Sequence, residues 1–481
     1  MPSIKHELIN GVIWTAIGKY SGMAVSLIVS AILARLLSPE EFGIIAIANV
    51  IIWFFAMFAS MGIGPAIIQR KDLSQKDVNC IFTFTIIVGL FLGGIVYACS
   101  WIVADFYKNE QLIPVTQILA LNLFLSTTNM VPSSLMAKNK RFKEGAIISF
   151  SLNVLTGIIS VIAAYKGAGV YALLISPVLT PIGTYFYNQH FYKTRVVFHF
   201  SLEPIKRIFS YSFYQFLFEF VNYFSRNLDK LIIGKYMNMV DLGYYEKSYR
   251  LMQLPLQNIT SVINPVLQPI FSTFQDDPST IGNKYNKIIR FVSTISFPIT
   301  AILNICGYEI IHLFYGGNWD TAVPVFKILS LAVALQMILS TSGAIFMASN
   351  NTKAQFWVGI RNTLTTIIGF FIAALVYGTI EAMAWAWVIT LFVNFICTYY
   401  IMYKLVLKIS IIPMLKEMLH PFINCLILFL CGVIMAKFLI IDNILVLVVV
   451  KSIILILIGL VYIQLSKQYN LLSFLHNKLH K

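Results

Sequence analysis

The sequence predicts an all-α integral membrane protein with about fourteen transmembrane helices, forming two six-helix lobes in a parallel repeat and two further C-terminal helices. Three observations lead to this fold class. The composition is 58% hydrophobic and 11% charged, with a mean hydropathy of +0.79, whereas soluble domains are about 45–50% apolar and about 25% charged. Apolar runs of roughly 20–28 residues recur along the chain, and each is long enough to cross about 30 Å of hydrocarbon. An internal repeat groups these runs into two halves.

The predicted spans follow one another with short polar breaks between them. The first run is interpreted as a span and not as a cleavable signal peptide, because it is longer than a signal core and lacks a convincing cleavage motif. The approximate ranges are 11–34, 43–68, 78–104, 112–136, 145–165, 169–189, 208–234, 243–271, 288–312, 322–348, 354–377, 379–403, 413–436 and 443–465.

Lysine and arginine residues are distributed unevenly between the loops, although the net charge is +15. If the N-terminus is cytoplasmic, the inward loops hold roughly 23 of the 35 basic residues and the outward loops about five. This positive-inside bias predicts that both termini are cytoplasmic. The basic balance is therefore attributed to topology, and no nucleic-acid partner is expected.

The internal repeat appears at an offset of about 200 residues. "ARLLSPEEFG" (34–43) aligns with "GKYMNMVDLG" (234–243), and Pro65 aligns with Pro265. At a slightly larger offset, "PVTQILAL" (114–121) aligns with "PVFKILSL" (324–331). An even number of spans in each half makes the repeat parallel, and such transporters bind substrate near the bilayer midplane. The predicted domains are 1–200 and 201–405, one six-helix lobe each, and 406–481, two additional helices and a cytoplasmic tail.

The seventh and eighth spans each carry one polar face. On a helical wheel, Glu219, Arg226 and Lys230 fall within about 40° of one another, and Asn222 and Asp229 form an adjoining stripe. Ionisable residues inside a span are costly and by default indicate a functional site. In the eighth span, polar residues recur every three or four positions, namely Glu246, Arg250, Gln253, Gln257, Ser261, Asn264 and Gln268.

Weaker stripes of small polar residues occur in three other spans. Two interpretations stay open for them: the residues line a water-accessible cavity, or they hold neighbouring helices together. The stripes comprise Thr15, Lys19, Gly22, Ser26 and Ser30 in the first span, Asn122, Ser126, Asn129 and Ser133 in the fourth, and Ser149, Asn153, Thr156 and Ser160 in the fifth.

The sign of the net charge in the predicted cavity follows from the ionisable residues of the repeat. Lys247 and Lys451 are expected to snorkel and are discounted. The acids are Glu219, Asp229 and Glu246, and the bases are Lys19, Arg226, Lys230, Arg250 and Lys327. The positive excess favours an anionic substrate, and the planar fork of arginine suits phosphate.

The chain resembles the polysaccharide-export, WzxC-like branch of the lipid-linked oligosaccharide flippases, which belong to the multidrug/oligosaccharidyl-lipid/polysaccharide (MOP) exporter superfamily. The resemblance extends from about residue 10 to residue 405. It rests on "ARLLSPEEFG" (34–43), "AIIQRKDLS" (66–74), "NYFSRNLDKLIIGKYM" (222–237), "LGYYEKSYRLMQLPLQNI" (242–259) and "FQDD" (274–277). One departure is Ser60, where the family often has an acid, so no acidic coupling site is carried over to the first half.

The resemblance implies a V-shaped pair of lobes, as in MATE transporters, and a location in the bacterial inner membrane. It implies that the protein flips undecaprenyl-diphosphate-linked oligosaccharide units from the cytoplasmic to the periplasmic leaflet, for O-antigen, capsule or exopolysaccharide synthesis. The bilayer, the lipid-linked glycan and other polysaccharide-assembly membrane proteins are the expected partners. The resemblance gives Arg226 a diphosphate-binding role, followed by Arg250 and Lys19.

The hypothesis for transport is alternating access of the two lobes around a cationic cavity. Lys19, Arg226, Lys230 and Arg250 would attract the diphosphate, and Asn222, Gln253 and Gln257 would bind the glycan. Glu219, Asp229 and Glu246 are the candidates for ion coupling.

Two rival functions are kept. A MATE-like drug or cation antiporter would require a cavity with the opposite sign of net charge. A polytopic enzyme of glycan assembly would require catalytic groups near one membrane face, and "QDD" (275–277) is interpreted as a solvated charge cluster in a linker. The six cysteines and seven histidines show no ligand spacing, so no metal, cofactor or catalytic residue is predicted.

Overall fold

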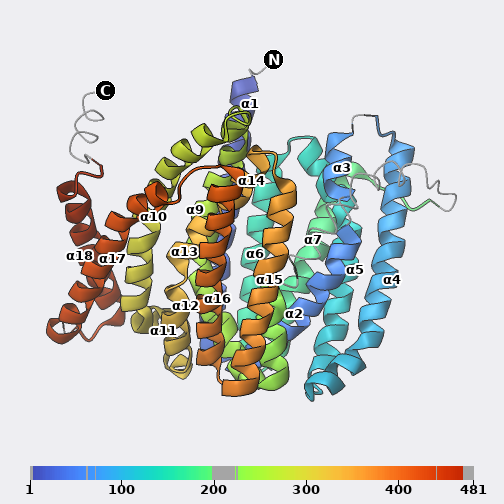
Figure 1. Cartoon of the computed structure of the whole chain (residues 1–481). Helices are drawn as coiled ribbons and strands as arrows, with labels where there is room; N and C mark the ends of the chain where they lie inside the picture. Colours follow the sequence, from blue (N-terminus) through green and yellow to red (C-terminus); the bar gives the residue numbers. More distant parts are fainter. Residues whose placement is uncertain are drawn as a thin grey trace. The chain divides into compact units, whose positions relative to one another are not determined.

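The computed structural model describes residues 4–60, 63–70, 72–197, 223, 226–439 and 441–469, with side chains from residue 11 onward. Every regular element within these residues is a helix, which confirms the all-α prediction (Figure 1). The chain divides into two compact units, Met1–Gly243 and Tyr244–Lys481. The division at residues 200 and 405, which comes from the sequence repeat, stays a prediction.

The first unit is built from long helices joined by short loops. Residues 226–236 are helical, and α9 (Met239–Ser272) begins here and continues into the second unit. The preceding elements are α1 (Ile4–Leu36), α2 (Pro39–Ser60), α3 (Ile63–Gln69), α4 (Gln75–Tyr107), α5 (Leu112–Lys138), α6 (Phe142–Tyr165), the 3₁₀ helix η1 (Gly169–Leu174) and α7 (Ile175–Tyr192).

The second unit contains long and short helices, two of which end in a π-helical turn. Its elements after α9 are α10 (Pro278–Ile305), α11 (Gly307–Tyr315), η2 (Gly317–Trp319), α12 (Ala322–Ser330), α13 (Val333–Leu339), α14 (Ser342–Ala348), α15 (Thr352–Ile372), η3 (Ala373–Tyr377), α16 (Ile380–Ile401), η4 (Met402–Val406), α17 (Ile412–Phe438) and α18 (Ile444–Leu465).

Among the described residues, 11 helices are long and apolar enough to cross a membrane, or 12 if the bent run from α12 to α14 counts as one span. The predicted count of fourteen is therefore not confirmed. The predicted span 208–234 lies largely outside the described residues. The predicted span 243–271 is helical as part of α9, but α9 is not among those 11 because its polar stripe lowers its hydropathy.

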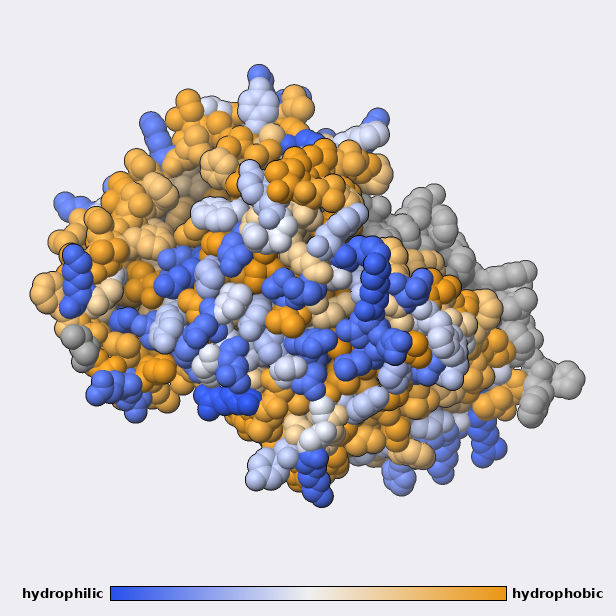
Figure 2. Space-filling model, turned by 90° about the horizontal axis from the view of Figure 1, so that it is seen from below, coloured by the Kyte–Doolittle hydropathy of each residue, from blue (hydrophilic) through white to orange (hydrophobic). Residues whose placement is uncertain are grey.

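The flanks of the helices are apolar where the packing leaves them exposed. Phe91 and Ile102 on α4 are 67% and 69% exposed, and Leu430 on α17 is 66% exposed. Seen from below (Figure 2), hydrophilic residues gather on the helix ends, whereas hydrophobic residues cover the flanks. Water would penalise this distribution, whereas a bilayer matches it, with apolar flanks facing lipid and polar ends facing water.

The predicted span 322–348 is bent by 45° between α12 and α13. Side chains of α10 occupy the break. Asn304 Nδ2 donates to the Lys327 carbonyl oxygen at 2.7 Å, and the Ala334 amide donates to Thr300 Oγ1 at 3.0 Å. A helix can break at membrane depth only where other groups satisfy its backbone, and Thr300 and Asn304 do this here.

The two helices α17 and α18 belong to the second unit and are attached to it by two ion pairs. Glu417 on α17 forms a two-pronged pair with Arg290 on α10, in which Arg290 Nη2 lies 2.6 Å from Glu417 Oε1. Lys451 on α18 pairs with Glu309 on α11. The predicted appendage is therefore fixed to the other helices of this unit by charge as well as by packing.

Two glycines that the sequence repeat aligns make reciprocal close contacts within the first unit. A Cβ atom at Gly43, near the start of α2, would overlap the Met239 carbonyl oxygen. A Cβ atom at Gly243, near the start of α9, would overlap the Pro39 carbonyl oxygen. Only residues without a side chain let the two helix starts approach this closely.

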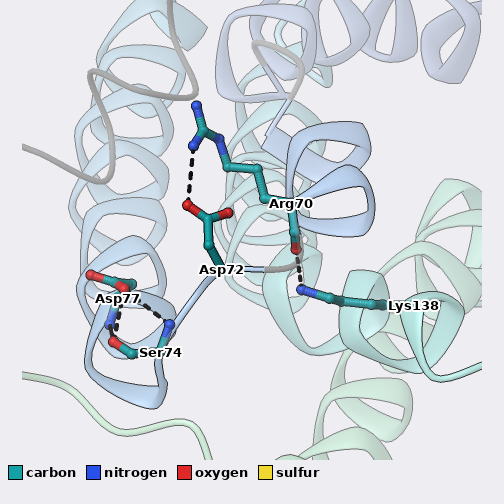
Figure 3. Close-up of polar contacts among 5 residues, drawn as sticks. All are labelled: Arg70, Asp72, Ser74, Asp77 and Lys138. Atoms are coloured by element: carbon teal, nitrogen blue, oxygen red, sulfur yellow. Dashed lines mark hydrogen bonds and ion pairs between the residues drawn. The ribbon is translucent and has the colours of Figure 1, made fainter.

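The loop within the "AIIQRKDLS" motif is held by polar contacts (Figure 3). Lys138 Nζ, at the end of α5, donates to the Arg70 carbonyl oxygen at 2.5 Å, and Arg70 Nη1 lies 3.5 Å from Asp72 Oδ2. Ser74 and Asp77 form a capping box that begins α4. The motif thus fixes the passage from α3 to α4 against the end of α5.

Candidate substrate-binding site

The described part of the predicted seventh span packs against α2 and the end of α4. The Tyr223 hydroxyl donates to the Val50 carbonyl oxygen. Lys235 Nζ donates to the Phe106 carbonyl oxygen at 2.6 Å and lies 3.9 Å from the centre of the Phe106 ring. These contacts fix the orientation of residues 226–236 within the first unit.

The four charged residues of this helix differ in exposure, and Lys235 is half-buried. Asp229 and Lys230 are buried, at 1% and 6% exposure, and Arg226 is exposed. Asp229 Oδ1 accepts a hydrogen bond from the Lys230 amide at 2.9 Å, and Lys230 Nζ lies 5.8 Å from the centre of the Trp53 ring. Arg226 is therefore the most exposed charge of this helix. Glu219 and Asn222, predicted for the same helix, lie outside the described residues.

Lys19 is also exposed, on α1, with its Nζ atom 5.8 Å from the centre of the Tyr20 ring. Its neighbours Gly18 and Gly22 face α6, where added Cβ atoms would meet Ala146 and Asn153. Lys19 thus extends from a helix that is anchored through its glycines. Among the described residues, no contact joins Lys19 to Arg226.

On α9, within the second unit, Arg250 and Gln257 are exposed, and Glu246 and Gln253 are half-buried. Gln253 Nε2 donates to the Tyr249 hydroxyl at 2.8 Å. The stripe therefore presents one guanidinium and the amide groups of Gln257 and Gln268 at the surface of the unit, whereas Gln253 and Asn264 are half-buried.

The expectation that Lys247 and Lys451 snorkel is wrong. Lys247 is 2% exposed, and its Nζ atom lies 5.0 Å from the centre of the Tyr315 ring. Lys451 is 7% exposed and pairs with Glu309. Both ammonium groups are enclosed by other helices of the second unit, and both have polar or aromatic partners there.

The weaker stripes act partly as contacts between helices. Asn188 on α7 donates to Asn129 Oδ1 at 3.2 Å and to Ser133 Oγ at 3.0 Å, both on α5. Thr156 Oγ1 on α6 lies 3.0 Å from Ser176 Oγ on α7. For these residues the structure supports the interpretation as links between helices.

The acidic "FQDD" segment has a structural role. Asp277 is the N-cap of α10, and its carboxylate accepts hydrogen bonds from the Thr280 amide at 3.1 Å and from the Ser279 hydroxyl at 2.7 Å. Hydrogen bonds from the Thr280 and Ser279 side chains lower the pKa of Asp277 to about 2. Among the described residues, no three His, Cys, Asp or Glu side chains are grouped as metal ligands.

Sequence reasoning missed the contacts of five charged residues of the second unit, although it named Lys451 as an interface residue. Four form the two ion pairs, and their partners are too far apart in sequence for a helical wheel to connect them. The fifth, Arg361, interrupts an apolar run in the sequence. That interruption alone would have been sufficient to identify it as a candidate. Because the ion pairs are neutral overall, Arg361 makes the positive excess larger.

The helical fold and the charged positions within its spans define the class of this protein: a multi-pass membrane protein with the fold of MOP-superfamily transporters. It resembles the lipid II flippase MurJ in an inward closed conformation, with a TM-score of 0.74, 16% identity, and coverage of 95% of this chain and 99% of the other. It also resembles an inward-facing multidrug resistance MATE family transporter of the MOP superfamily, with a TM-score of 0.59, 13% identity, and coverage of 81% and 98%.

The chain matches the family described as polysaccharide biosynthesis protein over residues 32–324, and it belongs to that family. It is 25% identical to the teichuronic acid biosynthesis protein TuaB of Bacillus subtilis (strain 168), over 88% of each chain. It is 22% identical to the lipopolysaccharide biosynthesis protein WzxC of Escherichia coli (strain K12), over 87% of this chain and 86% of the other. The predicted family is thus confirmed. The prediction that the protein is a transporter and not an enzyme is confirmed as well.

Proposed function

We propose that this protein moves undecaprenyl-diphosphate-linked oligosaccharide units from the cytoplasmic to the periplasmic leaflet of a bacterial inner membrane. The observation that carries the proposal is the exposed guanidinium of Arg226, on a helix whose other three charges are buried or half-buried, in a chain of the polysaccharide biosynthesis family. An arginine in a membrane-spanning segment is expected to have a function, and its planar fork suits phosphate oxygens.

The proposed roles involve residues of both units. In the first unit, Lys19, Arg226 and Lys230 are the proposed diphosphate ligands, together with Asn222 for the glycan. In the second unit, Arg250 contributes a further positive charge, and Gln253 and Gln257 bind sugar hydroxyls. Glu219, Asp229 and Glu246 are the proposed sites of ion coupling.

The proposed mechanism is alternating access of two six-helix lobes, 1–200 and 201–405, with 406–481 as two additional helices and a tail. The proposed topology has both termini in the cytoplasm, because the basic loops are then inside. Other membrane proteins of polysaccharide assembly are the proposed partners.

The test is movement of a polyprenyl-diphosphate oligosaccharide between leaflets of liposomes that contain the purified protein. An organic cation is the control substrate, because a MATE-like antiporter would move the cation. We expect movement of the glycan lipid and not of the cation. Movement of the cation alone would overturn the proposal in favour of the antiporter.

The role of Arg226 is tested in the same liposomes with Arg226→Ala. We expect transfer to fall about tenfold or more, because a charge-assisted hydrogen bond to phosphate is lost. Lys166→Ala is the matched control, since Lys166 is an exposed basic residue at the end of α6 in the same unit. Full transfer by Arg226→Ala at normal protein level would remove Arg226 from the site.

A further inference from the structure

Arg361 lies near the middle of the membrane-spanning helix α15 and has only neutral hydrogen-bond partners among the described residues. Its Nη2 atom donates to Asn362 Oδ1 and, at 3.4 Å, to the Asn394 carbonyl oxygen on α16. Its Nε atom is buried and lacks a hydrogen-bond partner in the described structure. None of the ion pairs in the described residues includes Arg361.

In the same unit, two other basic residues of membrane-spanning helices have carboxylate partners. Arg290 pairs with Glu417, and Lys451 pairs with Glu309. A charge within a membrane span is costly unless it is paired, and a guanidinium has five donor hydrogens to satisfy. Arg361 therefore has capacity left for an anion that is not part of the described structure.

The neighbours of Arg361 on α16 also have unused polar groups. Asn394 is 5% exposed, and its Nδ2 atom donates to the Asn362 carbonyl oxygen and to Thr366 Oγ1, both at 3.2 Å. Its Oδ1 atom, like the Trp387 Nε1 atom, is buried and lacks a partner among the described residues. Leaving such buried groups unsatisfied costs free energy, so a ligand that pairs with them gains affinity.

Trp387 adds an aromatic surface about two helical turns from Asn394. Its ring is stacked with Phe370 of α15 at a centroid distance of 6.1 Å and meets Tyr249 of α9 edge-on at 5.7 Å. Tyr249 in turn accepts the hydrogen bond from Gln253. Three groups thus lie along the contact between α15 and α16, next to the polar stripe of α9. The Arg361 guanidinium can bind an anion, the Asn394 amide oxygen can accept a hydrogen bond, and the Trp387 indole N–H can donate one.

Packing of such a helix pair does not require these groups. The fifth and sixth spans of the first unit, α6 and α7, meet through hydroxyl groups, with Thr156 Oγ1 at 3.0 Å from Ser176 Oγ. The described α6–α7 hydrogen bonds contain no arginine. The charge at Arg361 is therefore an addition to this helix pair and not part of its usual packing.

We propose that Arg361, Asn394 and Trp387 bind the glycan part of the substrate and recognise a carboxylate on an acidic sugar. The proposal rests on the function proposed above and names the substrate class. A single guanidinium among neutral groups matches one carboxylate, whereas a diphosphate carries more negative charge and favours several cations. Asn394 Oδ1 would accept a hydrogen bond from a sugar hydroxyl, and Trp387 Nε1 would donate one.

The test compares two polyprenyl-diphosphate trisaccharides that differ at one sugar, glucuronic acid or glucose, in liposomes with the wild-type protein and with Arg361→Gln. We expect the wild type to transfer the acidic lipid about tenfold faster or more, and Arg361→Gln to lose this preference while transfer of the neutral lipid stays within about twofold. Lys353→Gln, an exposed charge on the same helix, is the matched control and should keep the preference.

Each other outcome has a definite meaning. If Arg361→Gln slows both lipids equally, Arg361 binds the phosphate that they share, and the assignment to the glycan is overturned. If the variant behaves as the wild type, Arg361 does not bind substrate. If the wild type moves both lipids equally fast, acid recognition fails while the proposed function stands; if it moves neither lipid, both fail.

A second variant guards against misfolding of Arg361→Gln. Asn394→Asp places a carboxylate beside Arg361 and supplies the missing counter-ion within the protein. We expect this variant to unfold at the same temperature as the wild type or higher, and to lose the preference for the acidic lipid. A stable Asn394→Asp protein that keeps the full preference would overturn the proposal.

Discussion

Lys451 of α18 and Glu309 of α11 form an ion pair inside the second unit, with side chains that are 9% and 6% exposed. Replacing Lys451 by Met would leave the Glu309 carboxylate buried without its counter-charge. We expect a loss of about 3–5 kcal/mol in the free energy of unfolding, because breaking one side of a buried pair strands the other charge. Denaturant unfolding in detergent measures this.

The double variant Glu309→Gln with Lys451→Met is the companion measurement. It removes both charges, so we expect it to be more stable than Lys451→Met alone. Lys437→Met, an exposed charge at the end of α17, serves as the control and should change little. Equal losses for the single and double variants would show that the charges do not interact.

The contact at Gly43 predicts that even one methyl group is not tolerated. In Gly43→Ala the new Cβ would overlap the Met239 carbonyl oxygen, so the backbone must shift. We expect a loss of about 1–3 kcal/mol in the free energy of unfolding, the usual range for overpacking. Gly94→Ala on α4 is the matched control, since nothing lies within 4 Å of its Cβ position, and alanine favours the helix there. If the two variants unfold alike, the close approach is not rigid.

The break between α12 and α13 predicts a specific role for one hydroxyl of α10. In Thr300→Val, the Ala334 amide loses its acceptor while the side-chain shape is kept. We expect unfolding to become easier by about 1–3 kcal/mol, the cost of an unsatisfied buried donor. Thr363→Val is the control, because the Thr363 hydroxyl bonds only the Gly359 carbonyl of its own helix. Amide hydrogen exchange at Ala334 would report the loss directly.

The cap of α10 predicts a pH dependence at the acidic end. The hydrogen bonds to the Asp277 carboxylate lower its pKa from 3.8 to about 2 in the folded state. A lowered pKa means that this stabilisation is complete above pH 3.8 and is lost as the pH falls toward 2. Unfolding temperatures measured between these values should fall less steeply for Asp277→Asn than for the wild type. Asp276→Asn should follow the wild type, and parallel curves for all three proteins would contradict the assignment.

Much of the fold follows from the apolar runs, because a run of that length in a bilayer has to form a helix. The bend between α12 and α13 was not predictable, since no proline lies at the break and the compensating groups, Thr300 and Asn304, come from another helix. The buried positions of Lys247 and Lys451 were missed for a related reason. Their surroundings come from distant segments, so a single helix viewed alone made both look like interface residues.

The candidate site, like the fold, was predictable from the sequence only in part. The polar faces of residues 226–236 and α9 were visible as spacing, and the structure adds which of their charges are exposed. Arg361 needed no structure to be noticed, but that it has no carboxylate partner among the described residues is a property of the packed α15 and α16 and could not be read from the sequence.

The ion pairs of α17 and α18 also constrain how this protein can be shortened. A chain that stopped after η4 would keep Arg290 and Glu309 but lose Glu417 and Lys451, the partners of both. The remaining helices would then expose one positive and one negative charge toward lipid. A viable shortened version would need neutral residues at positions 290 and 309, so the length of the chain and the charge pattern of α10 and α11 must change together.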